Sequence, residues 1–352
     1  MKIRLYTAFN PCNFACEYCI TMDRIEDRPE EEKAQKSLPI LSRIARNLAQ
    51  PKKTAARIAA VAKSPSMLFS RQEPATWSED KFERIVDRIG ELPYKVDLRI
   101  GVGGEFFLSK TLANGARKIT NYDNVVALNL ISNLSFRYKQ YQKILDGFDL
   151  SKVALVCSYH PTQVKDRAVW RETAVRMSKL VDLAVIVVAW PPVLDRIEDF
   201  KKEFADAGLT VFVQAFNGWV NGKKYPDSYS EEERALLRSL AYSRHDYAHM
   251  VELKTPGLCY AGMDYVLMNI NGEVFRCGGF HVPYGNIFDG FKLLEKPTEC
   301  PVTECWCDTD NLNTVAFREN YEMIGRNQHK YQYRFAEEAK LDPSLDEWSI
   351  DY

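Results

Sequence analysis

Six short apolar runs, rich in β-branched residues, alternate with helical patterns between residues 2 and 216 of this chain. Each run is almost continuously apolar, which is typical of a strand covered on both faces. Strands that alternate with helices in this way predict a parallel sheet with right-handed crossovers. The periodicity fits either an open doubly wound sheet or a barrel. The runs span residues 2–9, 95–102, 125–132, 153–159, 182–190 and 210–216.

The helical patterns between these runs each place apolar side chains on one face. Thr76 and Glu79 have the spacing of a capping box ahead of the first helix, and Gly208 marks the end of the last. The predicted buried stripes are Phe82, Ile85, Val86 and Ile89; Trp170, Ala174, Met177 and Val181; and Ile197, Phe200 and Phe204.

The rest of the chain divides into further predicted parts. We expect a main domain over residues 1–220, with a helical insertion at 24–70 that suits a lid, a docking surface or a plain surface elaboration. A loop followed by a linker helix is expected at 221–250. Asn271-Gly272 between two apolar runs predicts a β-hairpin in a small domain at 251–310. We expect the tail at 311–352 to be helical.

Charge and hydropathy narrow the classes of partner. The chain has 47 basic and 48 acidic residues, for a formal net charge of −1, so nucleic acid is an unlikely partner. No apolar stretch is long enough for a membrane span, and the N-terminus lacks the apolar core of a secretory signal. We therefore expect a cytoplasmic protein without a membrane partner. Eight of the nine cysteines form two clusters near opposite ends, which in a reducing compartment favours metal ligation over disulfides.

The first cluster, CNFACEYC, directly follows the first apolar run and contains Cys12, Cys16 and Cys19. Three thiolates are one fewer than a closed tetrahedral zinc site needs. A [4Fe–4S] cluster held by three thiolates would leave one iron free for an external ligand. The alternative is a zinc knuckle completed by a distant residue.

This Cys-x3-Cys-x2-Cys pattern, with Tyr18 before the last cysteine, resembles the signature of the radical S-adenosylmethionine superfamily. The resemblance implies that the three cysteines hold a [4Fe–4S] cluster whose free iron is chelated by S-adenosylmethionine. It implies reductive cleavage to methionine and a 5′-deoxyadenosyl radical that abstracts a substrate hydrogen, with an electron donor such as flavodoxin or ferredoxin. The implied fold is α/β: a partial (β/α)6 TIM-type barrel with its chemistry at the carboxyl ends of the strands.

A second likeness to this family lies after the second run, at Gly103, Gly104 and Glu105, where relatives contact the methionine amino group. Phe106 stands where relatives commonly have proline. Polar residues at the other strand ends become candidates for binding S-adenosylmethionine, and no catalytic residue is predicted. These candidates are Ser132, Asn133, Ser158 and Gln214, with Asn217 and His160 as weaker ones, whereas Cys157 is expected to be a buried apolar residue.

The second cluster comprises Cys259, Cys277, Cys300, Cys305 and Cys307. Its C-x12-G-x4-C segment resembles the opening of the SPASM and Twitch extensions, although the CxxCx5C run of a complete SPASM is missing. Five thiolates suffice for one auxiliary [4Fe–4S] cluster but not for two. We therefore expect a small C-terminal α+β iron–sulfur domain, built on the hairpin, in which Cys259, Cys277 and two of the last three cysteines bind the cluster. The alternative is a zinc site.

The resemblance implies an oxidoreductase. We expect net oxidation or dehydrogenation of a small polar metabolite, since no separate leader-binding domain is apparent, with a peptide substrate as the alternative. A non-catalytic iron–sulfur or zinc protein is the competing hypothesis from another class.

Overall fold

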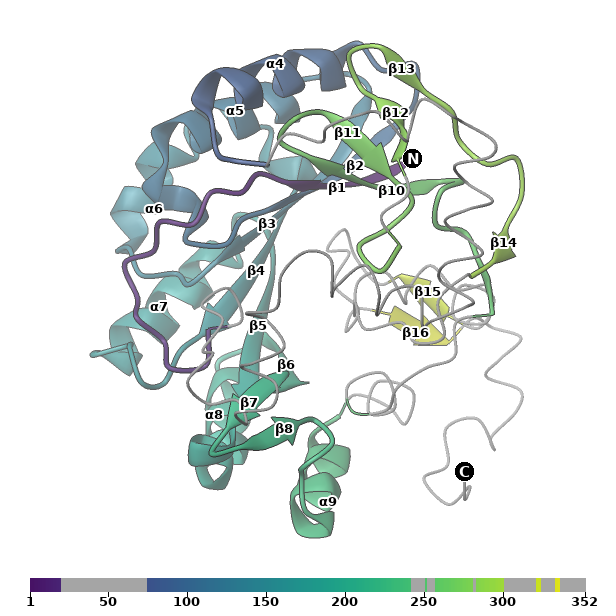
Figure 1. The fold of residues 1–352 in the computed structure, drawn as a ribbon. Coiled ribbons are helices and arrows are strands. Elements are labelled where there is room, and N and C mark those ends of the chain that lie inside the picture. Colours follow the sequence, from purple (N-terminus) through teal and green to yellow (C-terminus); the bar gives the residue numbers. More distant parts are fainter. Residues whose placement is uncertain are drawn as a thin grey trace.

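A ten-stranded sheet organises the computed structural model, in the order β13-β12-β11-β10-β1-β2-β3-β4-β5-β6 (Figure 1). The structure describes residues 1–19, 75–241, 251, 257–280 and 283–300, and the backbone of 321–323 and 333–335. The predicted insertion at 24–70, together with Cys305 and Cys307, lies outside these residues.

Strands β1 to β6 are all parallel and follow one another in sequence order, which confirms the six predicted strands. A doubly wound sheet would reverse its strand order at a switch point, and this sheet does not. The doubly wound alternative is therefore wrong. The bounds are Lys2–Tyr6 (β1), Val96–Gly101 (β2), Val125–Ser132 (β3), Val153–Tyr159 (β4), Asp182–Ala189 (β5) and Thr210–Ala215 (β6).

Helices α4 to α8 lie together on one face of this sheet (Figure 1). Their inward-facing side chains are buried at the predicted positions, from Phe82 in α4 to Phe204 in α8. The bounds are Glu79–Gly90 (α4), Lys110–Thr120 (α5), Tyr138–Ile144 (α6), Arg167–Met177 (α7) and Ile197–Asp206 (α8), with 3-10 helices at Phe106–Leu108 (η3), Leu150–Lys152 (η4) and Pro191–Arg196 (η5).

The predicted capping box of α4 is wrong by two residues. The helix begins at Glu79, so its N-cap is Ser78, whose hydroxyl accepts a hydrogen bond from the Lys81 backbone N–H at 3.4 Å. Thr76 lies one half-turn too early for this role, although its spacing to Glu79 matches the sequence pattern.

The predicted hairpin at Asn271-Gly272 is present, and it belongs to the main sheet. Strand β10 pairs in parallel with β1, and the chain then turns back through β11 and β12. The local pattern predicted the turn, but it contained no sign of this pairing with the first strand. The bounds are Tyr265–Asn269 (β10), Glu273–Phe275 (β11), Pro283–Asn286 (β12) and Gly290–Phe291 (β13).

Two predictions outside the main sheet need correction. The segment after β6 was expected to be a loop, but Gly218–Val220 (β7) and Lys223–Tyr225 (β8) form a hairpin before α9 (Glu231–Leu240). In the C-terminal tail, Tyr321–Met323 (β15) and Tyr333–Phe335 (β16) pair as antiparallel strands, so the helix prediction is wrong for these residues.

Within the described part of the chain, none of the helices combines the length and the apolar character needed to cross a membrane.

A buried tyrosine joins the ends of β5 and β6. The Tyr229 hydroxyl is buried, donates to the Ala189 carbonyl at 2.6 Å and accepts from the Phe216 N–H at 2.9 Å. Tyr229→Phe should lower the free energy of unfolding by about 1–3 kcal/mol, because both backbone groups lose their partner in a water-free site. Chemical denaturation would measure this. The exposed Tyr94 is the matched control, and an equal loss in Tyr94→Phe would contradict the explanation.

Candidate functional site

The cysteine-bearing loop at residues 7–19 leaves β1 and crosses the carboxyl ends of the neighbouring strands. At the end of β2, the Gly103 N–H donates to the Phe9 carbonyl at 2.8 Å and the Glu105 N–H donates to the Pro11 carbonyl at 2.9 Å. This backbone pairing fixes the start of the loop beside the segment that follows β2. Figure 1 shows the loop in purple, where it continues past α6 and α7.

Farther along, side chains from the next strand ends hold the loop. Asn13 donates to the Ser135 hydroxyl at 2.9 Å after β3. After β4, the Gln163 amide makes two hydrogen bonds to the backbone of Ala15, at 3.1 and 3.2 Å. Tyr18 packs against Trp190 at the end of β5, with ring centroids 5.0 Å apart. The loop therefore lies along the carboxyl edge of the parallel sheet.

The three thiols of this loop differ in environment. Cys12 is exposed, Cys19 is half-buried, and Cys16 is buried with its Sγ 3.2 Å from Nδ1 of His160. Burial, together with the neighbouring Cys19 and Cys12, raises the pKa of Cys16 to about 12. Among the described residues, no group of three His, Cys, Asp or Glu side chains has the arrangement of a metal site. The thiols are thus neighbours whose sulfur atoms do not converge on one point.

His160 contacts the cysteine-bearing loop. Its Nδ1 lies 3.0 Å from the Tyr18 hydroxyl, its ring stacks on Tyr18, and Phe14 meets its other side edge-on. Burial lowers its pKa to about 4, so the imidazole is neutral at physiological pH. The sequence left its role open, and the structure places it against Cys16.

Glu105 binds neighbouring strand ends together. Its side chain is 1% exposed, and its carboxylate oxygens accept from the Ser132 hydroxyl at 2.8 Å, the Asn133 N–H at 2.6 Å and the Phe107 N–H at 3.1 Å. Burial raises its pKa in spite of these donors. Both oxygens are engaged by the protein itself, so the geometry makes Glu105 a positioning residue. Its contact with a methionine amino group stays a prediction.

Gly103 and Gly104 permit the loop to approach the end of β2. A Cβ on Gly104 would lie 2.0 Å from the Pro11 carbonyl oxygen, and one on Gly103 would lie 2.0 Å from Oδ1 of Asn10. These glycines therefore let the cysteine loop approach the end of β2 closely, and their predicted contact with S-adenosylmethionine stays a prediction.

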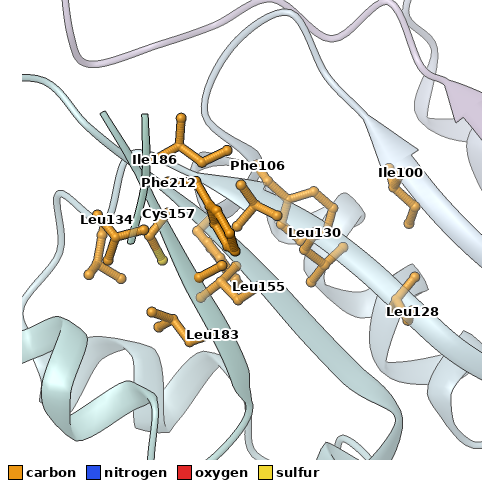
Figure 2. Packing of buried hydrophobic residues seen from close by; sticks show 14 of the residues in the cluster. Ile100, Phe106, Leu128, Leu130, Leu134, Leu155, Cys157, Leu183, Ile186 and Phe212 are labelled. Carbon is orange, nitrogen blue, oxygen red and sulfur yellow. The ribbon is translucent and has the colours of Figure 1, made fainter. Parts of the chain in front are cut away.

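The other candidates divide between the two faces of the sheet. Paired positions on neighbouring strands share a face, so Ser132 lies with Cys157 on the helix side, where its hydroxyl is 3.4 Å from that of Tyr141. Ser132 therefore supports Glu105 from the helix side of the sheet, and its contact with S-adenosylmethionine stays a prediction. Cys157 is fully buried in the apolar cluster of Figure 2, as predicted, and burial raises its thiol pKa. Asn217 is exposed after β6.

Asn133 contacts the cysteine loop through its side chain. Its amide donates to Oδ1 of Asn13 at 3.0 Å and lies 3.7 Å from the Cys12 sulfur. Its carbonyl accepts from the Trp170 indole N–H at 3.0 Å, which anchors the segment after β3. Asn13, Gln163 and Trp190 also belong to this site, and the sequence does not predict them, although Asn13 lies in the cysteine motif and Trp190 directly follows β5.

The face of the sheet opposite the helices is here called the inner face. Tyr159 packs against Trp170 and Phe204 on the helix side, so its neighbour Ser158 points to the inner face. Register and alternation then place polar and apolar side chains together on this face. The polar ones include Arg4, Arg99, Asn129, Ser158 and Gln214, and the apolar ones include Ile131, Val156, Ile186, Val188 and Phe212.

Asp97 also lies on the inner face, and it predicts a pH-dependent stability. Its carboxyl accepts from the Asn129 amide at 3.0 Å, and burial raises its pKa from 3.8 to about 7 against the opposing effect of Lys2. A raised carboxyl pKa means that the folded state holds the proton more tightly. Stability should therefore fall, on the order of 2 kcal/mol, as the pH rises from about 4 to about 7.

Asp97→Asn should remove this fall, because the amide cannot ionise and can still accept from Asn129. Denaturant titrations at several pH values would measure the slope. Asp123→Asn, at an exposed aspartate, should keep it. An unchanged slope in Asp97→Asn would show that another group causes the dependence.

The second cysteine cluster is brought together by a short antiparallel pair of strands. Leu258–Cys259 (β9) pairs with Thr298–Glu299 (β14), and the Cys300 N–H donates to the Gly257 carbonyl at 3.1 Å. Cys259 and Cys277 are both 6% exposed and share one apolar cluster. Cys300 directly follows β14 and is half-buried. The structure thus brings three of the five predicted ligands to one region, and Cys305 and Cys307 are not among the described residues.

Comparison with known proteins gives the following matches. No protein-family model matches the chain, and no curated protein sequence matches it significantly. Among solved structures, the chain is similar to a crystal structure of BtrN in complex with AdoMet and 2-DOIA, with 12% sequence identity, 82% of this chain and 79% of that chain covered, and a TM-score of 0.36. It is also similar to SeMet BtrN in an open conformation, with 10% identity, coverage of 82% and 76%, and a TM-score of 0.31.

Proposed function

We propose that this protein is a radical S-adenosylmethionine enzyme whose [4Fe–4S] cluster is held by Cys12, Cys16 and Cys19. The observation that carries the proposal is the position of the Cys-x3-Cys-x2-Cys loop. It lies along the carboxyl edge of six parallel strands, the edge at which barrels of this type bind their ligands. We also propose that these strands form a partial (β/α)6 barrel, since their order is that of a singly wound sheet.

The donor set fits an iron–sulfur cluster, since three thiols from one short loop leave one iron of a [4Fe–4S] cluster open. The same thiols with His160, whose Nδ1 lies 3.2 Å from the Cys16 sulfur, would form a Cys3His zinc site, so the position of the loop at the carboxyl edge of the strands is what favours the cluster. When bound, such a cluster supplies the electron that cleaves S-adenosylmethionine. Because the Cys16 sulfur faces His160, its thiolate must turn away from the imidazole to join the other two. An electron donor such as flavodoxin or ferredoxin is part of the proposal.

The chain's own residues would position S-adenosylmethionine at this edge. Asn133 lies next to Cys12 and presents an amide, while Ser158 and Gln214 present polar groups from the inner face. Glu105 and Ser132 hold the ends of β2 and β3 in register beneath them. We propose that Gly103 and Gly104 contribute because they let the cysteine loop lie close to the end of β2.

A small polar metabolite as substrate and a net oxidation or dehydrogenation as the reaction are part of the proposal, and polar inner-face side chains such as Arg4 and Arg99 support such a substrate. The second cysteine group supports an auxiliary [4Fe–4S] cluster in a Twitch-like segment, bound by Cys259, Cys277, Cys300 and one of Cys305 and Cys307. Such a cluster could accept an electron from a substrate radical. Peptide maturation is the second candidate activity.

The test is to purify the protein anaerobically, add S-adenosylmethionine and a reductant, and quantify 5′-deoxyadenosine. Formation of this product with about eight iron atoms per chain supports the proposal with both clusters. About four iron atoms and one zinc atom per chain would support the iron–sulfur cluster of the first site and would show that the second site is a structural zinc site. A non-catalytic metalloprotein would form no 5′-deoxyadenosine.

A further inference from the structure

Arg276 is a buried cation that makes no ion pair within the described part of the chain. Its side chain is 5% exposed. The guanidinium donates to three backbone carbonyls: Nε to Ala261 at 3.0 Å, Nη2 to Thr298 at 3.0 Å and Nη1 to Glu299 at 3.3 Å. Carbonyl dipoles replace part of its hydration but do not neutralise its charge. A guanidinium buried in this way is unfavourable unless a negative charge lies close by.

The contacts of Arg276 join the three described segments that carry the second cysteine group. Arg276 directly precedes Cys277, Ala261 is two residues after Cys259, and Glu299 directly precedes Cys300. One planar guanidinium therefore links the three described segments that carry these cysteines. Arginine suits this role because its donors form a fixed fork, which lysine lacks.

The burial of the thiols points to the missing negative charge. Cys259 and Cys277 lie in an apolar cluster with Ala261 and Tyr265, and no carboxylate pairs with Arg276 among the described residues. Thiolates that bind a metal cluster in such a site carry a net negative charge into the protein interior. A buried cation that makes no ion pair among the described residues and an anionic ligand set on the segments that it links would compensate each other.

We propose that Arg276 positions the ligands of the auxiliary cluster and provides its counter-charge. This inference rests on the proposed auxiliary cluster, and it adds a function for a residue that ligates no metal. A fixed positive charge beside the cluster stabilises the reduced form more than the oxidised form, because the reduced form is more negative. Arg276 therefore raises the reduction potential of this cluster and makes it a better electron acceptor.

The experiment uses the full chain with Cys12, Cys16 and Cys19 all replaced by alanine, so that only the second site can hold a cluster. Arg276→Gln removes the charge, and Arg276→Lys keeps the charge but loses the fork. The matched control is Arg234→Gln, because Arg234 also donates to three backbone carbonyls, those of Pro226, Asp227 and Tyr229, away from the cysteines. Iron and sulfide content, circular dichroism and an EPR-monitored redox titration are measured for each protein.

We expect Arg276→Gln to lower the equilibrium constant for one-electron reduction about tenfold, which corresponds to about 59 mV. Arg276→Lys should keep the parent potential and lose iron faster, while Arg234→Gln should match the parent in both. Loss of the cluster from Arg276→Gln with an unchanged circular dichroism spectrum also supports the proposal. If that variant does not fold, Arg276→Lys decides: a parent-like potential with faster iron loss supports the proposal, and any other result contradicts it.

Two negative outcomes separate the inference from the function on which it rests. If the parent protein with the three alanines binds no iron, the auxiliary iron–sulfur cluster itself is wrong. If the parent binds its cluster and Arg276→Gln keeps both the iron content and the potential, the auxiliary cluster stands and the role of Arg276 is wrong.

Discussion

Cys16→Ala is expected to reduce the formation of 5′-deoxyadenosine roughly 10³-fold or more, the equivalent of about 4 kcal/mol of lost stabilisation. Two thiolates from Cys12 and Cys19 cannot keep a cluster that three hold, so the variant should lose the iron of the first site. The measurement is anaerobic turnover of S-adenosylmethionine with parallel iron analysis. Wild-type iron content and product formation in Cys16→Ala would rule out the first site as proposed.

Cys157→Ala is the matched control for this experiment. Cys157 is at least as buried as Cys16, with exposed fractions of 0% and 6%, but it lies within strand β4 on the helix side of the sheet and outside the cysteine loop. Its removal should cost about 1–2 kcal/mol of stability through the small cavity, and leave iron binding and product formation near wild type. The pair of variants therefore separates loss of a ligand from loss of a buried thiol.

The parallel strands could be predicted from the sequence because burial on both faces leaves a continuous apolar run. β4, with the sequence VALVCSY, is the clearest case. The helices between the strands were equally legible, since each buries one stripe of side chains. The N-cap of α4 was harder to predict, because Thr76 and Ser78 both have side chains that can cap a helix. Only the packing of the first turn decides between them.

Short hairpins show the limit of local patterns. Asn271-Gly272 is predicted as a turn because apolar runs flank it, whereas Asn221-Gly222 has the same dipeptide between two three-residue strands that are too short to give such runs, so the sequence predicts a loop there. In the structure, Asn221 and Gly222 have φ values of 50° and 73°, as a tight hairpin turn requires. The pairing of β10 with β1 joins distant parts of the chain, and nothing in either segment encodes it.

In the candidate site, residue types could be predicted more easily than their partners. The cysteine motif and the Gly-Gly-Glu segment were both identified, but their direct contact with each other was not. Glu105 accepts hydrogen bonds from residues at the end of β3, which the sequence does not predict, and its contact with a ligand stays a prediction. A carboxylate in a sequence does not reveal which donors the fold will bring to it. His160 shows the same limit. The sequence assigns it only a weak role, yet it contacts Cys16, because the path of the loop decides which side chains meet.

Gly104→Ala is expected to displace the cysteine loop. The new Cβ would lie 2.0 Å from the Pro11 carbonyl oxygen and 2.5 Å from that of Asn10, and both are backbone atoms that cannot rotate away. The backbone of the loop must therefore move. We expect a loss of about 2–4 kcal/mol in the free energy of unfolding, and a large decrease in the iron bound at the first site. Denaturant titration and iron analysis of the anaerobically purified variant measure the two effects.

A graded series makes this prediction specific to the contact between the loop and the end of β2. Gly103→Ala meets mainly the side-chain oxygen of Asn10, which can rotate, so its effect should be smaller than that of Gly104→Ala. Gly257→Ala has no atom within 4 Å of the new Cβ and should leave stability and the first site unchanged. The order Gly104, Gly103, Gly257 should hold for both stability and iron content, because both depend on the same backbone contact. A Gly104→Ala protein with normal iron content and normal stability would mean that this contact does not position the loop, and the site would then have to be built from other strand ends.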